Sequence, residues 1–113
     1  MEIVEAKTGN VSVLSLAGRL DAYYAAELEK KLGTLIDTGQ IRLVVNLEKL
    51  EYISSSGLRV LLATLKKVRN LHGDVKLACL KPFIKEIFDI SGFTGLFNIF
   101  DAQETAIGNF DGF

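Results

Sequence analysis

Four consecutive residues, Ser54-Ser55-Ser56-Gly57, are the part of this sequence whose residue types and spacing are best suited to chemistry. They follow a strand-like run and come directly before a long apolar pattern that begins at Leu58. Serine hydroxyls at a helix start accept hydrogen bonds from its free amide groups, so capping is the simplest interpretation. A helix start also attracts phosphate, because its amides and the positive end of its dipole face the anion. Three hydroxyls followed by glycine exceed what a cap requires, and we expect function at this segment.

The other reactive residues do not indicate a second site. One cysteine, Cys79, and one histidine, His72, predict neither an internal disulfide nor a metal site. Cys79 lies in an apolar segment, which favours a buried structural thiol. A hydrolase nucleophile at Ser55 or Ser56 would need a base within reach, but His72 is expected about four turns away. Without a P-loop, dinucleotide fingerprint or nucleophile elbow, the sequence favours a protein that is not an enzyme and needs no cofactor.

The segment from Ile41 to Leu71 contains the elements that must position the serines. Residues 43–47 form a nearly continuous apolar run, which predicts a strand covered on both faces. After Gly57 the apolar residues recur every three or four positions, which predicts one face of a helix: Leu58, Leu61, Leu62, Leu65 and Val68. The glycine lets backbone or a partner approach closely.

The remaining sequence alternates strands and helices. Residues 2–7 and 11–16 read as two strands joined by a turn, and Asp21 is placed to cap the helix that follows, with Glu27 and Lys31 paired on its exposed side. The later elements are expected as a strand at 75–80, a helix from Pro82, a strand at 96–100 and a short helix behind a capping box at 101–104. The order β-β-α-β-α-β-α-β-α predicts an α/β fold with a mixed sheet, in which an antiparallel hairpin precedes β-α-β units packed with about four helices.

Composition limits the class of protein. The chain of 113 residues fits one domain, 1–113, and its 49% hydrophobic residues can build one core. With 13 basic and 14 acidic residues, the net charge of −1 gives no electrostatic case for binding nucleic acid or an anionic membrane surface. No apolar stretch is long enough to span a bilayer and the N-terminus lacks a secretion signal, so a cytoplasmic location is expected.

The run VVNLEKLEYISSSGLRVLLATLKKV resembles the signature region of the STAS domain, found in anti-sigma factor antagonists and in sulfate transporter tails. In that family a strand enters a turn usually written Asp-Ser-Ser-Gly and continues into an apolar helix. Upstream, the segment 18–21 resembles the step from glycine to aspartate before the family's first helix, and the order of elements matches over essentially the whole chain.

The resemblance implies a phosphorylation switch with Ser56 as the phosphoacceptor, because this serine immediately precedes the glycine. In such antagonists the unmodified protein binds an anti-sigma factor, which is itself a serine protein kinase, and frees the sigma factor for transcription. Phosphorylation breaks this association and a phosphatase restores it, an arrangement called partner switching. The residues that the resemblance places at the partner-binding surface are Asp21, Ser54, Ser55, Gly57 and Leu58.

Two residues depart from the family pattern. Ser54 stands where the signature usually begins with aspartate, and Asn46 stands where the preceding strand often ends in one. Both are expected to remove negative charge close to Ser56, which reduces repulsion toward phosphate and alters how a kinase positions the hydroxyl.

Two alternatives remain open from the sequence. One is another STAS role, as a subunit of a different signalling assembly or of a membrane transport system. The other is a small-ligand or nucleotide-binding domain, for which the helix start before Leu58 is the candidate anion site.

Overall fold

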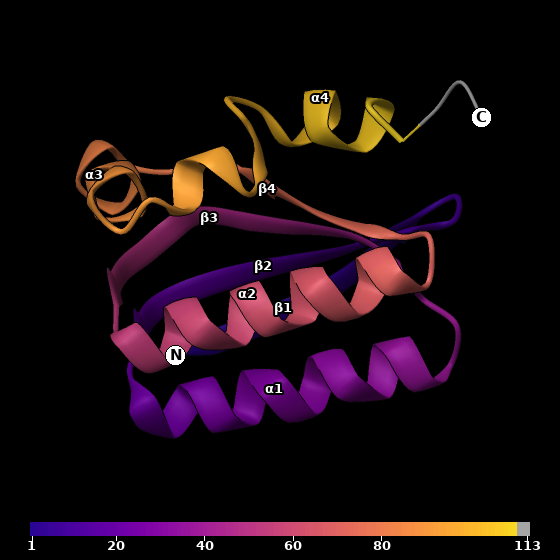
Figure 1. Cartoon of the computed structure of the whole chain (residues 1–113), viewed down its shortest axis with the longest axis horizontal. Coiled ribbons are helices and arrows are strands. Elements are labelled where there is room, and N and C mark those ends of the chain that lie inside the picture. The colour runs from indigo at the N-terminus through magenta and orange to yellow at the C-terminus, as the bar shows by residue number, and fades with distance from the viewer. Residues whose placement is uncertain (111–113) are drawn as a thin grey trace.

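A mixed sheet with helices on both faces forms the centre of the molecule (Figure 1). The structure, a computed structural model, describes residues 1–110. Its elements follow the predicted order, with one added 3₁₀ turn (η1): β1 (Glu2–Thr8), β2 (Val11–Leu20), α1 (Ala22–Asp37), β3 (Arg42–Ile53), α2 (Ser55–Asn70), β4 (Asp74–Ala78), α3 (Pro82–Ile90), η1 (Phe93–Gly95), β5 (Asn98–Phe100) and α4 (Gln103–Gly108).

The five strands lie in the order β1-β2-β3-β4-β5, so each strand pairs with its neighbour in the sequence. The first pair is antiparallel and the other three pairs are parallel, each joined by a helical crossover. This confirms the predicted mixed sheet of the α/β class. Because the parallel strands all end at one edge, α1 and α2 begin side by side at that edge, on the left in Figure 1.

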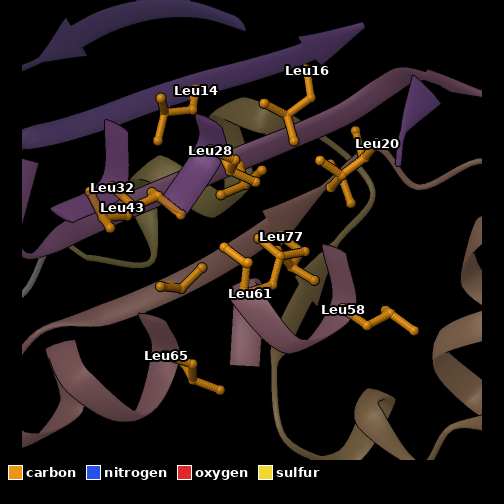
Figure 2. Packing of buried hydrophobic residues seen from close by; sticks show 14 of the residues in the cluster. Leu14, Leu16, Leu20, Leu28, Leu32, Leu43, Leu58, Leu61, Leu65 and Leu77 are labelled. Atoms are coloured by element: carbon orange, nitrogen blue, oxygen red, sulfur yellow. The ribbon is translucent and has the colours of Figure 1, made fainter. Parts of the chain in front are cut away.

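Apolar side chains bury both faces of β3, as the continuous run predicted. Leu43 and Val45 belong to the larger cluster beneath α1 and α2, whereas Val44 belongs to a smaller cluster that includes Ala106 of α4. Figure 2 shows leucines from both sides of the larger cluster, among them Leu61 and Leu77. Successive side chains of a strand point to opposite faces of the sheet, and helices pack on each of the two faces.

The apolar face of α2 is the predicted one, with Leu61 and Leu65 no more than 1% exposed. Leu62 is only half-buried, while Val60 and Thr64 are buried in addition. The buried surface is wider than the sequence pattern indicated because α2 packs against α1 as well as the sheet.

The strand before the serines is longer than predicted. The apolar run ends at Leu47, but β3 continues to Ile53 through Glu48, Lys49 and Glu51. In this second half β3 pairs with β2 alone, since β4 ends opposite Asn46. Exposed polar side chains are therefore tolerated there. Because they interrupt the apolar run, the sequence pattern did not predict this half of the strand.

Two local predictions are wrong. The capping box at 101–104 does not form, because the cap position of α4 is Ala102, which offers no side-chain acceptor. Lys31 does not pair with Glu27: its Nζ atom lies 2.7 Å from Oε2 of Glu5 on the neighbouring strand β1. Glu27 lies beside Tyr23 instead. In both places a tertiary contact or a one-residue shift replaces the local pairing that sequence spacing suggested.

Candidate functional site

The serine run lies at the edge of the sheet where β2 and β3 end together. Leu20 and Ile53 are opposite each other in the parallel register, and the amide of Ser54 donates a 2.9 Å hydrogen bond to the carbonyl of Leu20. Asp21 and Ser54 are the next residues of the two strands, and each starts a helix. The structure therefore places the two predicted site residues next to each other, although 32 residues lie between them in the sequence.

Both residues cap their helices. Oδ1 of Asp21 accepts a 3.0 Å hydrogen bond from the amide of Tyr24, and Oγ of Ser54 accepts a 3.1 Å hydrogen bond from the amide of Gly57. The predicted capping role of Asp21 is confirmed. Serine and aspartate are similarly good caps, so Ser54 preserves the helix start where the family usually has aspartate, without its charge.

The other two serines have different surroundings. Ser55 is exposed, whereas Ser56 is half-buried and its Oγ accepts a 3.3 Å hydrogen bond from Nη2 of Arg59. Arg59 was not singled out from the sequence, although its spacing of three residues from Ser56 on a helix predicts such a contact. The hydroxyl of Ser56 therefore lies beside a cation at the first turn of α2.

Gly57 and Leu58 are buried and shape the edge from beneath. A Cβ atom at Gly57 would lie 2.8 Å from Cγ of Leu20, so the glycine allows α2 to begin tightly against the end of β2. Leu58 is 7% exposed and belongs to the core. The close approach that the sequence suggested at Gly57 is thus made by the chain itself.

Exposed aromatic residues flank the serines. Tyr23 is 67% exposed and its ring meets that of Tyr24 edge to face, with centroids 4.9 Å apart. The charge of Glu27, together with its hydrogen bond to the phenol, raises the pKa of Tyr23 above its ordinary value. On the adjacent strand ends, the guanidinium of Arg19 lies 4.2 Å from the ring centre of Tyr52. These residues, which sequence reasoning missed, add apolar and hydrogen-bonding surface to the edge.

Asn46 does not lie near the acceptor, and the expectation that it changes the charge there is wrong. It sits in the middle of β3, where its amide nitrogen donates a 2.8 Å hydrogen bond to Oε1 of Gln103 and its oxygen accepts from the amide of Glu48 at 2.9 Å. The strand runs on from Asn46 to Ile53, a distance of about 23 Å at the usual rise per residue. Its side chain joins β3 to α4, and of the two departures only Ser54 bears on the serine run.

The two other reactive residues lie apart from the serines. His72 lies two residues beyond Asn70, the last residue of α2, and about 24 Å from Ser56 at the helical rise per residue, so it cannot activate that hydroxyl. Cys79 is half-buried, and burial is the main cause that raises the pKa of its thiol. Within residues 1–110 no three His, Cys, Asp or Glu side chains come close enough to hold a metal ion. None of the helices in this range is both long and apolar enough to span a bilayer.

The arrangement presents a hydroxyl acceptor beside a cation, at a surface formed by two capped helix starts. The hydroxyl of Ser56 is partly exposed to solvent, and the side chain that contacts it is that of Arg59.

Comparisons with known proteins were made on sequence and on fold. The sequence profile described as STAS domain matches residues 2–106. The protein BtrV of Bordetella bronchiseptica, assigned by its name to the anti-sigma factor antagonists, is 36% identical over 110 residues, which are 97% of this chain and 95% of BtrV. The anti-sigma-B factor antagonist of Bacillus subtilis is 32% identical over 94 residues, 83% of this chain and 85% of that protein.

The fold is also that of the anti-sigma factor antagonist SpoIIAA. Its unphosphorylated form superimposes with a TM-score of 0.80 at 23% identity, covering 99% of this chain and 100% of SpoIIAA. The phosphorylated form, from Bacillus, gives a TM-score of 0.78 at 24% identity and covers 96% of this chain and 99% of the other.

Proposed function

This chain belongs to the STAS domain family, and from that premise we propose that it is an anti-sigma factor antagonist switched by phosphorylation of Ser56. Two relatives above 30% identity are named as anti-sigma factor antagonists, which supports the antagonist role. In its unmodified form the protein binds an anti-sigma factor of the serine-kinase type, and the sigma factor is released to RNA polymerase. A cytoplasmic location follows from this role, because transcription takes place there.

The observation that carries the proposal is the placement of the Ser56 hydroxyl. The oxygen of Ser54 is occupied as a helix cap, whereas that of Ser56 lies half-buried beside Arg59 at the edge of the sheet. Ser56 also directly precedes Gly57, as the family pattern requires of the acceptor. Ser56 therefore supplies the hydroxyl, and the chain needs no catalytic residue or cofactor of its own.

The reaction at Ser56 is a phosphoryl transfer catalysed by the partner. The Oγ atom attacks the γ-phosphorus of ATP, an O–P bond forms, the bond to the β-phosphate oxygen breaks, and ADP leaves. The hydroxyl proton passes to a base of the kinase. A phosphatase reverses the modification by hydrolysing the new O–P bond, which regenerates the hydroxyl and releases inorganic phosphate.

The proposed partner-binding surface is the edge around this acceptor. Asp21, Ser54 and Ser55 would contact the partner, since all three are at least partly exposed. Gly57 and Leu58 are buried, and we assign them the supporting role of holding the first turn of α2 against β2.

Release of the partner follows from charge and desolvation. Phosphorylation adds about 1.5–2 negative charges at neutral pH to a surface that fits a small neutral hydroxyl. Rebinding would require the phosphate to lose its water and to fit an interface shaped for a neutral hydroxyl, which opposes association.

The test is phosphorylation by the host's anti-sigma factor kinase, followed by peptide mapping. Wild-type protein and the Ser55→Ala variant are both expected to carry the phosphate on Ser56. Ser56→Ala should lose labelling while keeping its fold, as judged by circular dichroism. Phosphate mapped to Ser54 or Ser55 in the wild-type protein would contradict the assignment.

The relatives favour the antagonist role over the other STAS roles and over nucleotide binding. The two relatives named above are anti-sigma factor antagonists by name, and the match covers most of the length of each. No specific feature of residues 1–110 favours a small ligand at the serine run over a protein partner.

A further inference from the structure

Arg59 is held against the acceptor hydroxyl by the geometry of α2. Its Nη2 atom donates a 3.3 Å hydrogen bond to Oγ of Ser56, and residues three apart on a helix lie on the same face. The arginine is exposed, and within residues 1–110 no carboxylate lies within ion-pair distance of its guanidinium. Its charge therefore has only the neutral hydroxyl as its side-chain partner.

We propose that Arg59 is the intramolecular counter-ion of a phosphate group on Ser56. This inference rests on the proposed function, because it concerns the modified form of the same serine. A guanidinium presents its N–H donors as a planar fork that matches two phosphate oxygens. A hydrogen bond from this cation to an anionic phosphate oxygen is stronger than the present one, in which the guanidinium donates to a neutral hydroxyl. The side chain is already in place, so the contact needs no rearrangement of α2.

The counter-ion determines how the phosphate titrates. A nearby cation stabilises the dianion relative to the monoanion, so Arg59 lowers the second pKa of the phosphate below its ordinary value of about 6. The phosphorylated protein then carries nearly the full double charge at neutral pH. Arg59 thereby makes the electrostatic difference between the two forms larger and less sensitive to small changes in pH.

Other ionisable groups at this edge also influence the phosphate pKa, but they cannot cause a difference between the wild-type protein and a variant at position 59. The ends of β2 and β3, the first turn of α1, the residue before α3 and the N-terminus beside Gly18 carry further ionisable groups, which are Arg19, Asp21, Tyr23, Tyr24, Glu51, Tyr52, Lys81 and the amino group of Met1. They are the same in the wild-type protein and in a variant at position 59. A difference between the two proteins therefore isolates Arg59.

The experiment installs phosphoserine at position 56 by genetic code expansion and follows its titration by phosphorus NMR at low ionic strength. Arg59→Gln should raise the phosphate pKa by roughly half a pH unit, less than in buried pairs because the arginine is exposed. Arg59→Lys, which keeps the charge but not the fork, should restore part of the shift. Lys66→Gln is the matched control, because it removes one charge from an exposed position of α2 that lies about 15 Å along the helix from Ser56.

Equal pKa values in the wild-type protein and Arg59→Gln would overturn the proposal, as would an equal shift in Lys66→Gln. The phosphate is introduced without a kinase, so the result is independent of the proposed function. A shift in Arg59→Gln supports the counter-ion even if no host kinase labels Ser56. Labelling of Ser56 with no such shift would contradict the counter-ion and leave the proposed function intact.

Discussion

The three adjacent serines differ in what their hydroxyl oxygens contact, and this difference separates structure from signalling. Ser54 accepts a hydrogen bond from the amide of Gly57, Ser55 is exposed, and Ser56 accepts from Arg59. Ser54 therefore secures the helix, and Ser56, two positions later, supplies the hydroxyl that we propose a partner recognises. The division of roles depends on backbone geometry at the first turn, where successive side chains point in different directions.

We expect Ser54→Ala to lower the free energy of unfolding by about 1 kcal/mol, the usual effect of removing a helix cap. Ser55→Ala serves as the matched control and should change stability by less than about 0.5 kcal/mol, since its side chain is exposed. Chemical denaturation of the two variants measures both values. Equal stability of the two variants would show that the Ser54 cap contributes nothing.

At the scale of elements, the tight start of α2 against β2 positions the site. Leu20 is fully buried at the end of β2, directly beneath Gly57. The same two strands end opposite each other, which brings Asp21 beside Ser54. Any change that lifts the first turn of α2 would therefore move Ser56 relative to the start of α1.

Replacing Gly57 by alanine tests this packing. The new methyl group would lie 2.8 Å from Cγ of Leu20, so Gly57→Ala should destabilise the protein by about 1–3 kcal/mol despite alanine's better helix propensity. Gly33→Ala on α1 is the control, because its Cβ would meet no atom within 4 Å. That variant should gain about 0.5–1 kcal/mol. Thermal melts that show both substitutions stabilising to the same degree would contradict the close contact.

The order of elements could be predicted because the apolar period changes where a strand gives way to a helix. The period identified α2 from Leu58 onward, but it could not find the second half of β3, where exposed polar residues continue the strand. For that reason Asn46 was expected at the end of the strand and close to Ser56, whereas it lies in the middle of β3. Pairing between β2 and β3 depends on contacts distant in sequence, so the meeting of Asp21 and Ser54 followed only from the resemblance.

At the scale of the whole molecule, the switch is expected to be local. α2 is packed along its length against the sheet and α1, and its first turn is secured by a cap and by the fit of Gly57 over Leu20. A phosphate on Ser56 would lie at the positive end of the α2 dipole and beside Arg59, which together stabilise an anion. We therefore expect the modified protein to stay folded, with a change only at the contact surface.

Binding of the anti-sigma factor to both forms, compared with their amide hydrogen exchange, tests this account most directly. Phosphorylated Ser56 should weaken the association by about 2–5 kcal/mol in calorimetry, roughly 30-fold to a few thousand-fold in Kd, because a charged and hydrated group enters an interface that fits a neutral hydroxyl. Amide protection in the sheet and in α2 should stay the same in the free protein. Unchanged affinity, or a loss of affinity accompanied by widespread loss of protection, would contradict a local electrostatic switch at Ser56.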